Sequence, residues 1–364
     1  MFKMKFKDRY KILHINNEMG NCLVGGAGTF MNEIYKYHKQ DTGFVYMNLG
    51  EPFDDFDVSN YQENGDIALI HKDESYKLSN IDFDILVVQF YEFAFCITEE
   101  LKKNKKIVYV IHSVPTPEPM TLENPFGCNQ EIKEKFEYLC ECADVLVCVS
   151  YAEKRKLEQI YPYYSHKIQV VHNGITFDEL PKLNKNYKKS RRVFGFIGRT
   201  DYRKGILECI KAIRDTDSEL RIACPKNDCE YLEKILLYIE AANLQDRVKF
   251  YGWCVGERKK NFYKSLDALI IPSLYEPFGY VALEGMQYGL PIISSNNGGL
   301  DEILEGYKYK YDPYSENGLI DIITEFQKDV DDEVHRQQEI LRKNLLRFNA
   351  KDMAEKYERI WRKL

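Results

Sequence analysis

Residues 271–291 read IPSLYEPFGYVALEGMQYGLP, and this stretch decides the fold and the site that the sequence predicts. An apolar segment at 269–271 has the character of a buried strand and stops at Pro272. Glu276 follows in a short loop, and a helical pattern begins at Pro277, whose missing N–H costs nothing in the first turn. The unpaired N–H groups of such a helix lie beyond the carboxyl end of the strand, where they attract phosphate.

Two acids in this stretch are spaced like groups that hold the two ends of one ligand. Glu284 lies eight positions after Glu276, roughly 10–12 Å along a helix, which is the span of a nucleoside diphosphate sugar. One acid can then hold ribose hydroxyls while the other meets the sugar. The alternative is an ordinary helix with two solvated acids, which fits the spacing alone but not the flanking PSLYEPFG and EGMQYGLPII.

A second pattern, GFIGRTDYRKGI at residues 195–206, also predicts phosphate binding. A buried strand ends at Gly198, and Arg199 and Lys204 then stand five positions apart before Gly205 opens onto a helix. A diphosphate is bound by compact, positively charged groups. Arginine offers several N–H donors in a planar arrangement, and lysine offers a single localised charge. The alternative is a solvated basic loop.

A glycine-rich loop, NCLVGGAGTF at 21–30, follows the first strand. Gly26 and Gly28 would let the backbone lie against a phosphate or a sugar. The loop is not a dinucleotide-binding fingerprint, because Met31 stands where the third glycine would be. A tight turn without a ligand remains the alternative.

Together these patterns resemble the GT4 family, retaining glycosyltransferases with the GT-B fold (glycosyl transferases group 1). Glu276 and Glu284 match its E-x7-E motif, and residues 198–205 match its G-R-x4-K-G pattern, whose arginine and lysine grip the donor's phosphates. The resemblance spans nearly the full chain and is most specific from 193 to 303. It implies that the glycine loop faces the donor's distal phosphate and the acceptor. It also implies that His112, which ends the strand at 107–111, contacts the donor sugar.

Three positions depart from the family pattern. Thr176 stands where an acid often follows the Asn173–Gly174 pair, and 223–225 reads ACP where many relatives have a glycine-rich turn. Gln89 ends the strand at 85–88 where a histidine is frequent. None of these positions belongs to the predicted phosphate grip or to the acid pair.

Strand-like Val/Ile/Leu runs alternate with helical patterns through the whole chain, which predicts an α/β protein with parallel sheets. With the resemblance, this gives a GT-B architecture, two Rossmann-like domains whose sheets face each other across a central cleft. The predicted domains are an N-terminal acceptor-side domain at 1–180, a linker at 181–192, a C-terminal donor-side domain at 193–345 and a C-terminal helix at 346–364 that crosses back to the first domain. The predicted strands are 11–15, 43–49, 67–70, 85–90, 107–111, 145–149, 168–171, 193–197, 220–223, 248–250, 269–271 and 291–294.

Bulk composition narrows the function classes. The 364 residues suit two domains, and the formal net charge of −6 argues against nucleic acid as the main partner. No apolar run has membrane-spanning length and no signal-peptide pattern is present, so we expect a cytoplasmic protein. The ten cysteines form no CxxC pair and are expected to be reduced.

The basic start, MFKMKFKDRYK, is either a solubilised lead-in to the first strand or a weak contact with the inner face of a membrane.

The resemblance implies transfer of a sugar from a nucleotide diphosphate sugar, with uridine preferred on family frequency, to a hydroxyl of a glycan, lipid-linked or other small acceptor. Surface polysaccharide or glycoconjugate synthesis would use such a step. No cofactor and no metal are expected, since cationic side chains carry the leaving-group charge. The alternatives are a GT-B-fold nucleotide-sugar epimerase and a non-catalytic nucleotide-sugar-binding protein. The predicted catalytic residues are Glu276, His112, Arg199 and Lys204, and the predicted donor-binding residues are Gly26, Gly28, Arg199, Lys204, Pro277, Phe278, Gly279 and Glu284.

Overall fold

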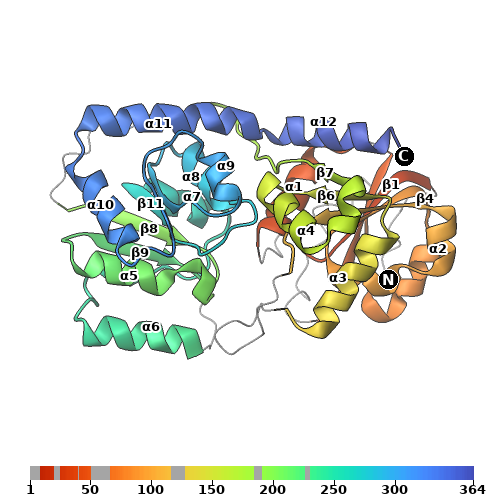
Figure 1. The fold of residues 1–364 in the computed structure, drawn as a ribbon, viewed down its shortest axis with the longest axis horizontal. Helices are drawn as coiled ribbons and strands as arrows, with labels where there is room; N and C mark the ends of the chain where they lie inside the picture. Colours follow the sequence, from red (N-terminus) through yellow and green to blue (C-terminus); the bar gives the residue numbers. More distant parts are fainter. Residues whose placement is uncertain are drawn as a thin grey trace. The chain divides into compact units, whose positions relative to one another are not determined.

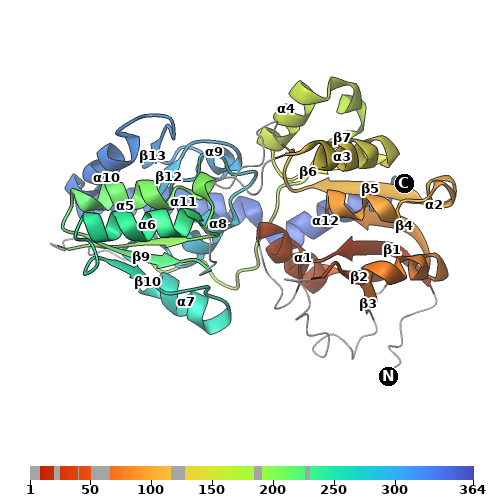
Figure 2. The same cartoon turned by 90° about the horizontal axis from the view of Figure 1, so that it is seen from below.

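The computed structural model describes residues 9–19, 25–39, 41–50, 66–115, 128–183, 191–225 and 230–364. The chain forms two compact units, each with its own sheet and helices (Figure 1, Figure 2). The first unit contains the described residues up to Thr176 together with Asn349–Leu364, and the second contains Phe177–Phe348. Of the linker predicted at 181–192, residues 184–190 lie outside the described residues.

The first unit is built on a parallel sheet. Its strands are β1 (Arg9–Asn16), β2 (Thr42–Asn48), β3 (Ile67–His71), β4 (Asp82–Val88), β5 (Lys106–Ile111), β6 (Val145–Cys148) and β7 (Ile168–Val170). They lie in the order β3-β2-β1-β4-β5-β6-β7, and every neighbouring pair is parallel. The helical segments are α1 (Gly26–Tyr37), η2 (Lys72–Asn80), η3 (Tyr91–Cys96), α2 (Glu99–Asn104), α3 (Gln130–Cys142), α4 (Tyr151–Ile160), η4 (Pro162–Lys167) and α12 (Ala350–Trp361).

The strand order of this sheet reverses beside β1, because β2 and β3 lie on one side of it and the later strands on the other. Open parallel sheets bind ligands outside the carboxyl ends of their strands at such a reversal. The glycine-rich loop follows β1, Gln89 follows β4 and His112 follows β5. The chain therefore brings the residues singled out in this unit to one edge of the sheet.

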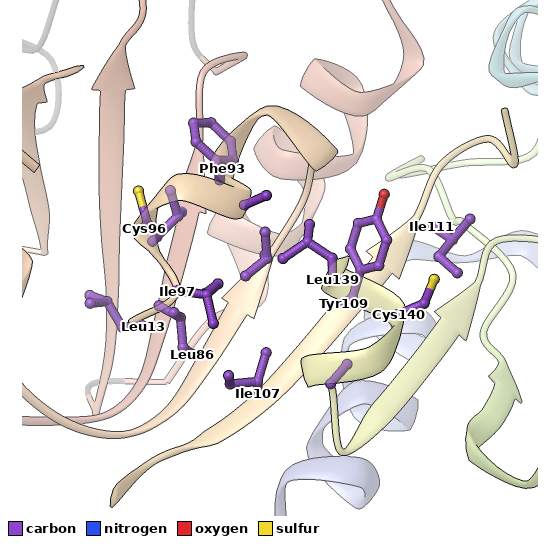
Figure 3. Close-up of a cluster of buried hydrophobic side chains, with 14 of the residues drawn as sticks. Leu13, Leu86, Phe93, Cys96, Ile97, Ile107, Tyr109, Ile111, Leu139 and Cys140 are labelled. Atoms are coloured by element: carbon purple, nitrogen blue, oxygen red, sulfur yellow. The ribbon is translucent and has the colours of Figure 1, made fainter. Parts of the chain in front are cut away.

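One hydrophobic cluster of the first unit lies between the sheet and the segments η3 and α3. Leu86 of β4 pairs in register with Ile107 of β5, and both side chains are buried. Phe93 of η3 and Leu139 of α3 belong to the same buried cluster, part of which is drawn in Figure 3. Burial of one such side chain stabilises the fold by about 1.5–3 kcal/mol. Each continuous apolar run of the sequence buries several of them, which explains why these runs form the strands of the sheet.

The last helix, α12, also belongs to the first unit, where it packs against α1. Met353, Tyr357, Ile360 and Trp361 on its apolar face are all buried, as the amphipathic pattern predicts. The rings of Tyr357 and Phe30 meet edge to face at 5.6 Å. This helix therefore contributes core to the unit that begins the chain.

The second unit also contains a parallel sheet. Its strands are β8 (Val193–Ile197), β9 (Glu219–Ala223), β10 (Val248–Phe250), β11 (Ala268–Ile271), β12 (Ile292–Ser295) and β13 (Lys310–Tyr311), in the order β10-β9-β8-β11-β12-β13. Its helical segments are η5 (Tyr202–Lys204), α5 (Ile206–Arg214), α6 (Glu230–Ala241), α7 (Gly256–Lys264), α8 (Tyr280–Gln287), α9 (Gly299–Ile303), α10 (Gly318–Lys328), α11 (Asp331–Leu345) and η6 (Leu346–Phe348). The order reverses beside β8, between β9 and β11. The loops after β8 and β11, which hold the two strongest sequence patterns, therefore leave adjacent strands at the reversal.

Each strand predicted from the sequence forms, with ends that differ by at most three residues. The structure adds β13, which the sequence did not reveal because two half-buried residues make no apolar run. All eight cysteines within the described residues are free thiols. No helix in the described part of the chain is both long and apolar enough to cross a membrane.

Candidate functional site

The loop after β8 is folded around a buried acid. Asp201 is 1% exposed, and its carboxylate accepts hydrogen bonds from the backbone N–H of Arg203 at 3.0 Å and from its guanidinium at 2.9 Å. The guanidinium of Arg199 lies 3.8 Å from the same carboxylate. Burial of Asp201 opposes its ionisation, but the bonds from Arg203 outweigh this and lower its pKa. Asp201 therefore stays charged and orients both arginines.

This loop packs directly against the segment that follows β11. The backbone N–H of Leu274 donates to the carbonyl of Arg203 at 2.8 Å. Gly205 has a φ of 71°, and a Cβ there would lie 2.5 Å from the carbonyl oxygen of Pro272, so only glycine fits. The ammonium of Lys204 forms an ion pair with the carboxylate of Glu276. Two patterns that the sequence suggested separately thus form one cluster.

Glu276 has hydrogen-bond partners in addition to Lys204. The Ser273 hydroxyl donates to its carboxylate at 2.8 Å, and its backbone carbonyl accepts from Gly299 N–H at 2.8 Å. Gly298 has a φ of 74°, and a Cβ there would lie 2.1 Å from the carbonyl oxygen of Glu276. Asn297 donates to the carbonyl of Leu274 at 2.7 Å. The run NNGG after β12 therefore fixes the loop that carries Glu276, and this run is the signal that could have been read from the sequence.

The helix after Glu276 begins later than predicted, which is a correction. Helix α8 starts at Tyr280, so Pro277 precedes the helix and does not occupy its first turn. Gly279 has a φ of 111°, a left-handed conformation that a continuous helix cannot contain. The expected 10–12 Å between the two acids along one helix therefore does not apply. Phe278 is buried and packs on Tyr280, so its side chain belongs to the core.

Glu284 lies in α8 and is 7% exposed. One oxygen of its carboxylate pairs with the ammonium of Lys259, and the other accepts a hydrogen bond from the Tyr263 hydroxyl at 2.7 Å. Burial, and secondarily the charge of Glu284, raises the pKa of Tyr263 well above its usual range, so the hydroxyl keeps its proton. Lys259 and Tyr263 are four positions apart on α7 and reach Glu284 from one helix face. Each carboxylate oxygen has a second lone pair that a ligand hydroxyl can use.

His112 is placed in the first unit by a buried amide. Its Nε2 lies 3.0 Å from Oε1 of Gln89, and Nε2 of Gln89 lies 3.2 Å from Nδ1 of His14. The His112 ring packs against Phe30 and Phe90, with ring centroids 5.0 Å and 5.7 Å away. Burial lowers the pKa of both histidines to about 3, so both rings are neutral near pH 7.

The backbone N–H groups of the glycine loop are already hydrogen-bonded to an acidic side chain, that of Glu18. The carboxylate of Glu18 accepts hydrogen bonds from the backbone N–H groups of Gly25 at 3.0 Å and Gly28 at 3.2 Å. Helix α1 has no acid in its first turn, and its N-cap, Gly25, has no side chain to cap it. Glu18 supplies both functions from the loop after β1. A phosphate would therefore share or displace this carboxylate at Gly28, while residues 20–24 of the loop lie outside the described residues.

The structure thus brings together some of the predicted residues and not others. Lys204 and Glu276 form an ion pair in the second unit, and Arg199 lies beside Asp201 in the same loop as Lys204. Glu284 pairs with Lys259 of α7 within the same unit. His112 and the glycine loop belong to the first unit. Sequence reasoning missed Asp201, Ser273, Glu18, Lys259 and Tyr263. Within the described ranges, no group of three or more His, Cys, Asp or Glu side chains could hold a metal ion.

The arrangement of strands and loops is that of a known class. HepE of Anabaena, solved in complex with UDP and glucose, aligns with 98% of this chain and 100% of its own, with a TM-score of 0.79 and 16% identity. The α/β GT-B fold predicted from the sequence is thereby confirmed. The fold of this chain is therefore the GT-B fold.

Two family models match successive parts of the chain. The model for glycosyltransferase family 4 covers residues 64–179, and the model for glycosyl transferases group 1 covers residues 179–344. These ranges contain His112 and both loops of the Lys204–Glu276 cluster. The chain belongs to the GT4-type glycosyltransferases, as its motifs predict.

Curated relatives match over part of their length. An uncharacterized glycosyltransferase of Methanocaldococcus jannaschii is 34% identical over 176 residues, which are 44% of this chain and 44% of the relative. A D-inositol 3-phosphate glycosyltransferase of Corynebacterium diphtheriae is 27% identical over 182 residues, 45% of this chain and 43% of the relative. The chain spans about half the length of the curated relatives it matches.

Proposed function

We propose that this protein is a retaining glycosyltransferase that moves a sugar from a nucleotide diphosphate sugar to a hydroxyl group. The observation that carries the proposal is the joined pair of loops after β8 and β11, in which Lys204 pairs with Glu276 and Arg199 lies in the same loop as Lys204. Membership of the GT4-type family supports the same reaction. A UDP-sugar is the first candidate donor, because HepE, which shares the fold, was solved with UDP and with UDP-glucose.

In this proposal Arg199 and Lys204 bind the diphosphate. Lys204 is already paired with Glu276, and the guanidinium of Arg199 lies 3.8 Å from the buried carboxylate of Asp201. As the bond from the anomeric carbon to the phosphate oxygen breaks, negative charge grows on the diphosphate, and fixed cations stabilise it without reorganisation. The backbone around Pro277, Phe278 and Gly279, before α8, would meet the same phosphates. Metal is not required by this arrangement of charge, and metal independence is part of the proposal.

Glu276 would face the reacting sugar and stabilise positive charge at the anomeric carbon. Retention then follows from substitution on one face of the sugar, where the acceptor oxygen bonds to the anomeric carbon as the phosphate leaves. The acceptor proton passes to a phosphate oxygen of the departing diphosphate. His112 would contact a sugar hydroxyl, Glu284 the ribose, and Gly26 and Gly28 the distal phosphate or acceptor.

The acceptor belongs to the proposal as a chemical class. We propose a hydroxyl of a glycan or of a lipid-linked saccharide, used in surface polysaccharide or glycoconjugate synthesis. A cytoplasmic location with weak contact between the basic N-terminus and the inner membrane face fits such an acceptor. Residues 1–8 of that segment lie outside the described residues.

A product assay separates the proposed reaction from its two alternatives. The protein is incubated with UDP-, GDP- and ADP-sugars, with and without a panel of glycosides and lipid-linked saccharides. Release of nucleoside diphosphate that depends on acceptor, together with a product of unchanged anomeric configuration, is the expected result. A sugar altered at one carbon without acceptor would indicate an epimerase. A bound nucleotide sugar that stays intact with every acceptor would indicate a binding protein.

Two variants make this assay specific for the cluster. Lys204→Ala removes the predicted phosphate contact and should lower diphosphate release. Lys211→Ala is the control, because Lys211 is exposed on α5 and pairs only weakly with Glu208, at 3.8 Å. Equal release from both variants would remove the cluster from the reaction.

A further inference from the structure

We propose that Gln89 is a positioning residue, which holds His112 in the tautomer that carries its proton on Nε2 and leaves Nδ1 as an acceptor. The role of Nδ1 toward a sugar rests on the proposed function, but the tautomer itself does not. Three neighbouring strands bring the groups together. His14 lies in β1, Gln89 follows β4 and His112 follows β5, and these strands are adjacent and parallel.

In the orientation observed, the amide of Gln89 forms hydrogen bonds with both histidine rings, and these bonds fix which ring nitrogen carries a proton. Its nitrogen can only donate and its oxygen can only accept. Because the amide nitrogen lies 3.2 Å from Nδ1 of His14, that ring nitrogen must be unprotonated. Because the amide oxygen lies 3.0 Å from Nε2 of His112, that nitrogen must carry the proton.

The amide is buried beside the two rings that it contacts. Gln89 is 1% exposed and His14 is 2% exposed. The His14 ring is stacked on Phe44 at 5.1 Å, and the His112 ring lies against Phe30 at 5.0 Å. A neutral ring with one proton fixed on Nε2 presents a lone pair at Nδ1. Gln89 thereby converts a partly exposed His112 into a hydrogen-bond acceptor.

An acceptor at Nδ1 selects the chemistry of the group that it meets. It binds a hydroxyl or an ammonium, which can donate a hydrogen bond, and it repels a carboxylate or phosphate, which cannot. If His112 meets the donor sugar, as in the proposed function, the position beside it must be a hydroxyl. A nucleotide sugar with a carboxylate at that position should be a poor donor, which makes Gln89 a determinant of donor specificity acting through His112.

Histidine NMR tests the tautomer without any substrate. In the full chain with ¹⁵N-labelled histidine, the His112 ring should give the signature of Nε2–H, assigned by its loss in His112→Asn. Gln89→Leu should turn this signal into a mixture of tautomers, and Gln89→Glu, whose carboxylate still accepts from Nε2, should restore it. An Nδ1–H tautomer in the unaltered protein, or no change in Gln89→Leu, would overturn the proposal.

Kinetics then distinguish a positioning role from a structural one. Gln89→Leu should lower turnover to nearly the level of His112→Ala. The variant that carries both substitutions should have the same turnover as His112→Ala, because the two changes remove the same function. Gln89→Glu should recover most of the turnover. Strictly additive losses would contradict action through His112. If the tautomer is as expected but no donor is turned over, the proposed function fails and the Gln89 assignment stands on the NMR result.

Discussion

Lys204 and Glu276 are ion-paired with each other, and this pairing sets what each residue does when a diphosphate arrives. Their types and positions could be predicted from the sequence, because an arginine, a lysine and an acid at strand ends are chemically conspicuous. Asp201 and Ser273 could not, because nothing in a single sequence marks which neighbouring polar residue turns inward. In the structure these two side chains orient Arg199 and Glu276, respectively.

Glu276→Gln should lower turnover by about a hundredfold, close to 2.7 kcal/mol, if the carboxylate stabilises charge that develops only in the transition state. Affinity for the free nucleoside diphosphate should stay the same or rise, because Lys204 loses a competing carboxylate. Paired kinetics and calorimetric titrations measure both effects, with Glu208→Gln on the exposed face of α5 as the control. Near-normal turnover would be incompatible with a sugar-facing Glu276.

Glu284→Ala should weaken nucleotide binding and also reduce the stability of the protein, because Lys259 and Tyr263 lose their shared partner. Loss of such buried contacts costs about 1–3 kcal/mol. Tyr263→Phe removes one of these contacts but keeps the carboxylate, so it should reduce stability while leaving nucleotide affinity nearly unchanged. Titration with nucleoside diphosphate and urea denaturation separate the two effects. If both variants weaken nucleotide binding equally, Glu284 has a structural role and not a ribose-binding one.

Strands were easier to predict from the sequence than the first residues of helices. Buried parallel strands show as continuous apolar runs, and β8 and β10 were located at their observed bounds. The start of α8 was misplaced because Gly279 adopts a left-handed conformation that its sequence context does not announce. The glycine loop was recognised, but the capping acid was not, because Glu18 lies ten positions before Gly28.

Glu18→Ala should destabilise the protein by about 1–3 kcal/mol, because two backbone N–H groups at the start of α1 lose a charged acceptor. Glu18→Gln keeps an acceptor without the charge and should cost less. Urea denaturation measures the loss, and faster amide exchange at Gly25 and Gly28 would locate it. Glu100→Ala, an exposed acid in the first turn of α2, is the matched control. A Glu18→Ala variant as stable as this control would show that the two contacts do not hold the loop.

The two units divide the predicted site residues between them. The second unit holds the cationic cluster and the acid pair, and the first holds the histidine–amide–histidine chain and the glycine loop. The alternation of strands and helices was sufficient to predict two parallel sheets. Substrate identity could not be predicted in this way, because it depends on side chains from loops whose partners lie far apart in the sequence.

Turnover should survive a strong chelator, because Arg199 and Lys204 supply the positive charge that the departing diphosphate needs. The measurement is acceptor-dependent diphosphate release before and after treatment with EDTA, followed by addition of magnesium or manganese. Activity that is lost with EDTA and restored by either ion would mean that a metal, and not these two side chains, carries the leaving-group charge.

Calorimetric titration with UDP, GDP and ADP measures whether the joined loops of the second unit bind a nucleoside diphosphate. We predict that at least one of them binds the unaltered protein. Lys204→Ala should bind it about 10- to 150-fold more weakly, equivalent to about 1.5–3 kcal/mol for one charge-assisted contact, while Lys211→Ala should bind it normally. Binding by none of the three nucleotides, or equal affinity in Lys204→Ala and the unaltered protein, would show that these loops are not a diphosphate site.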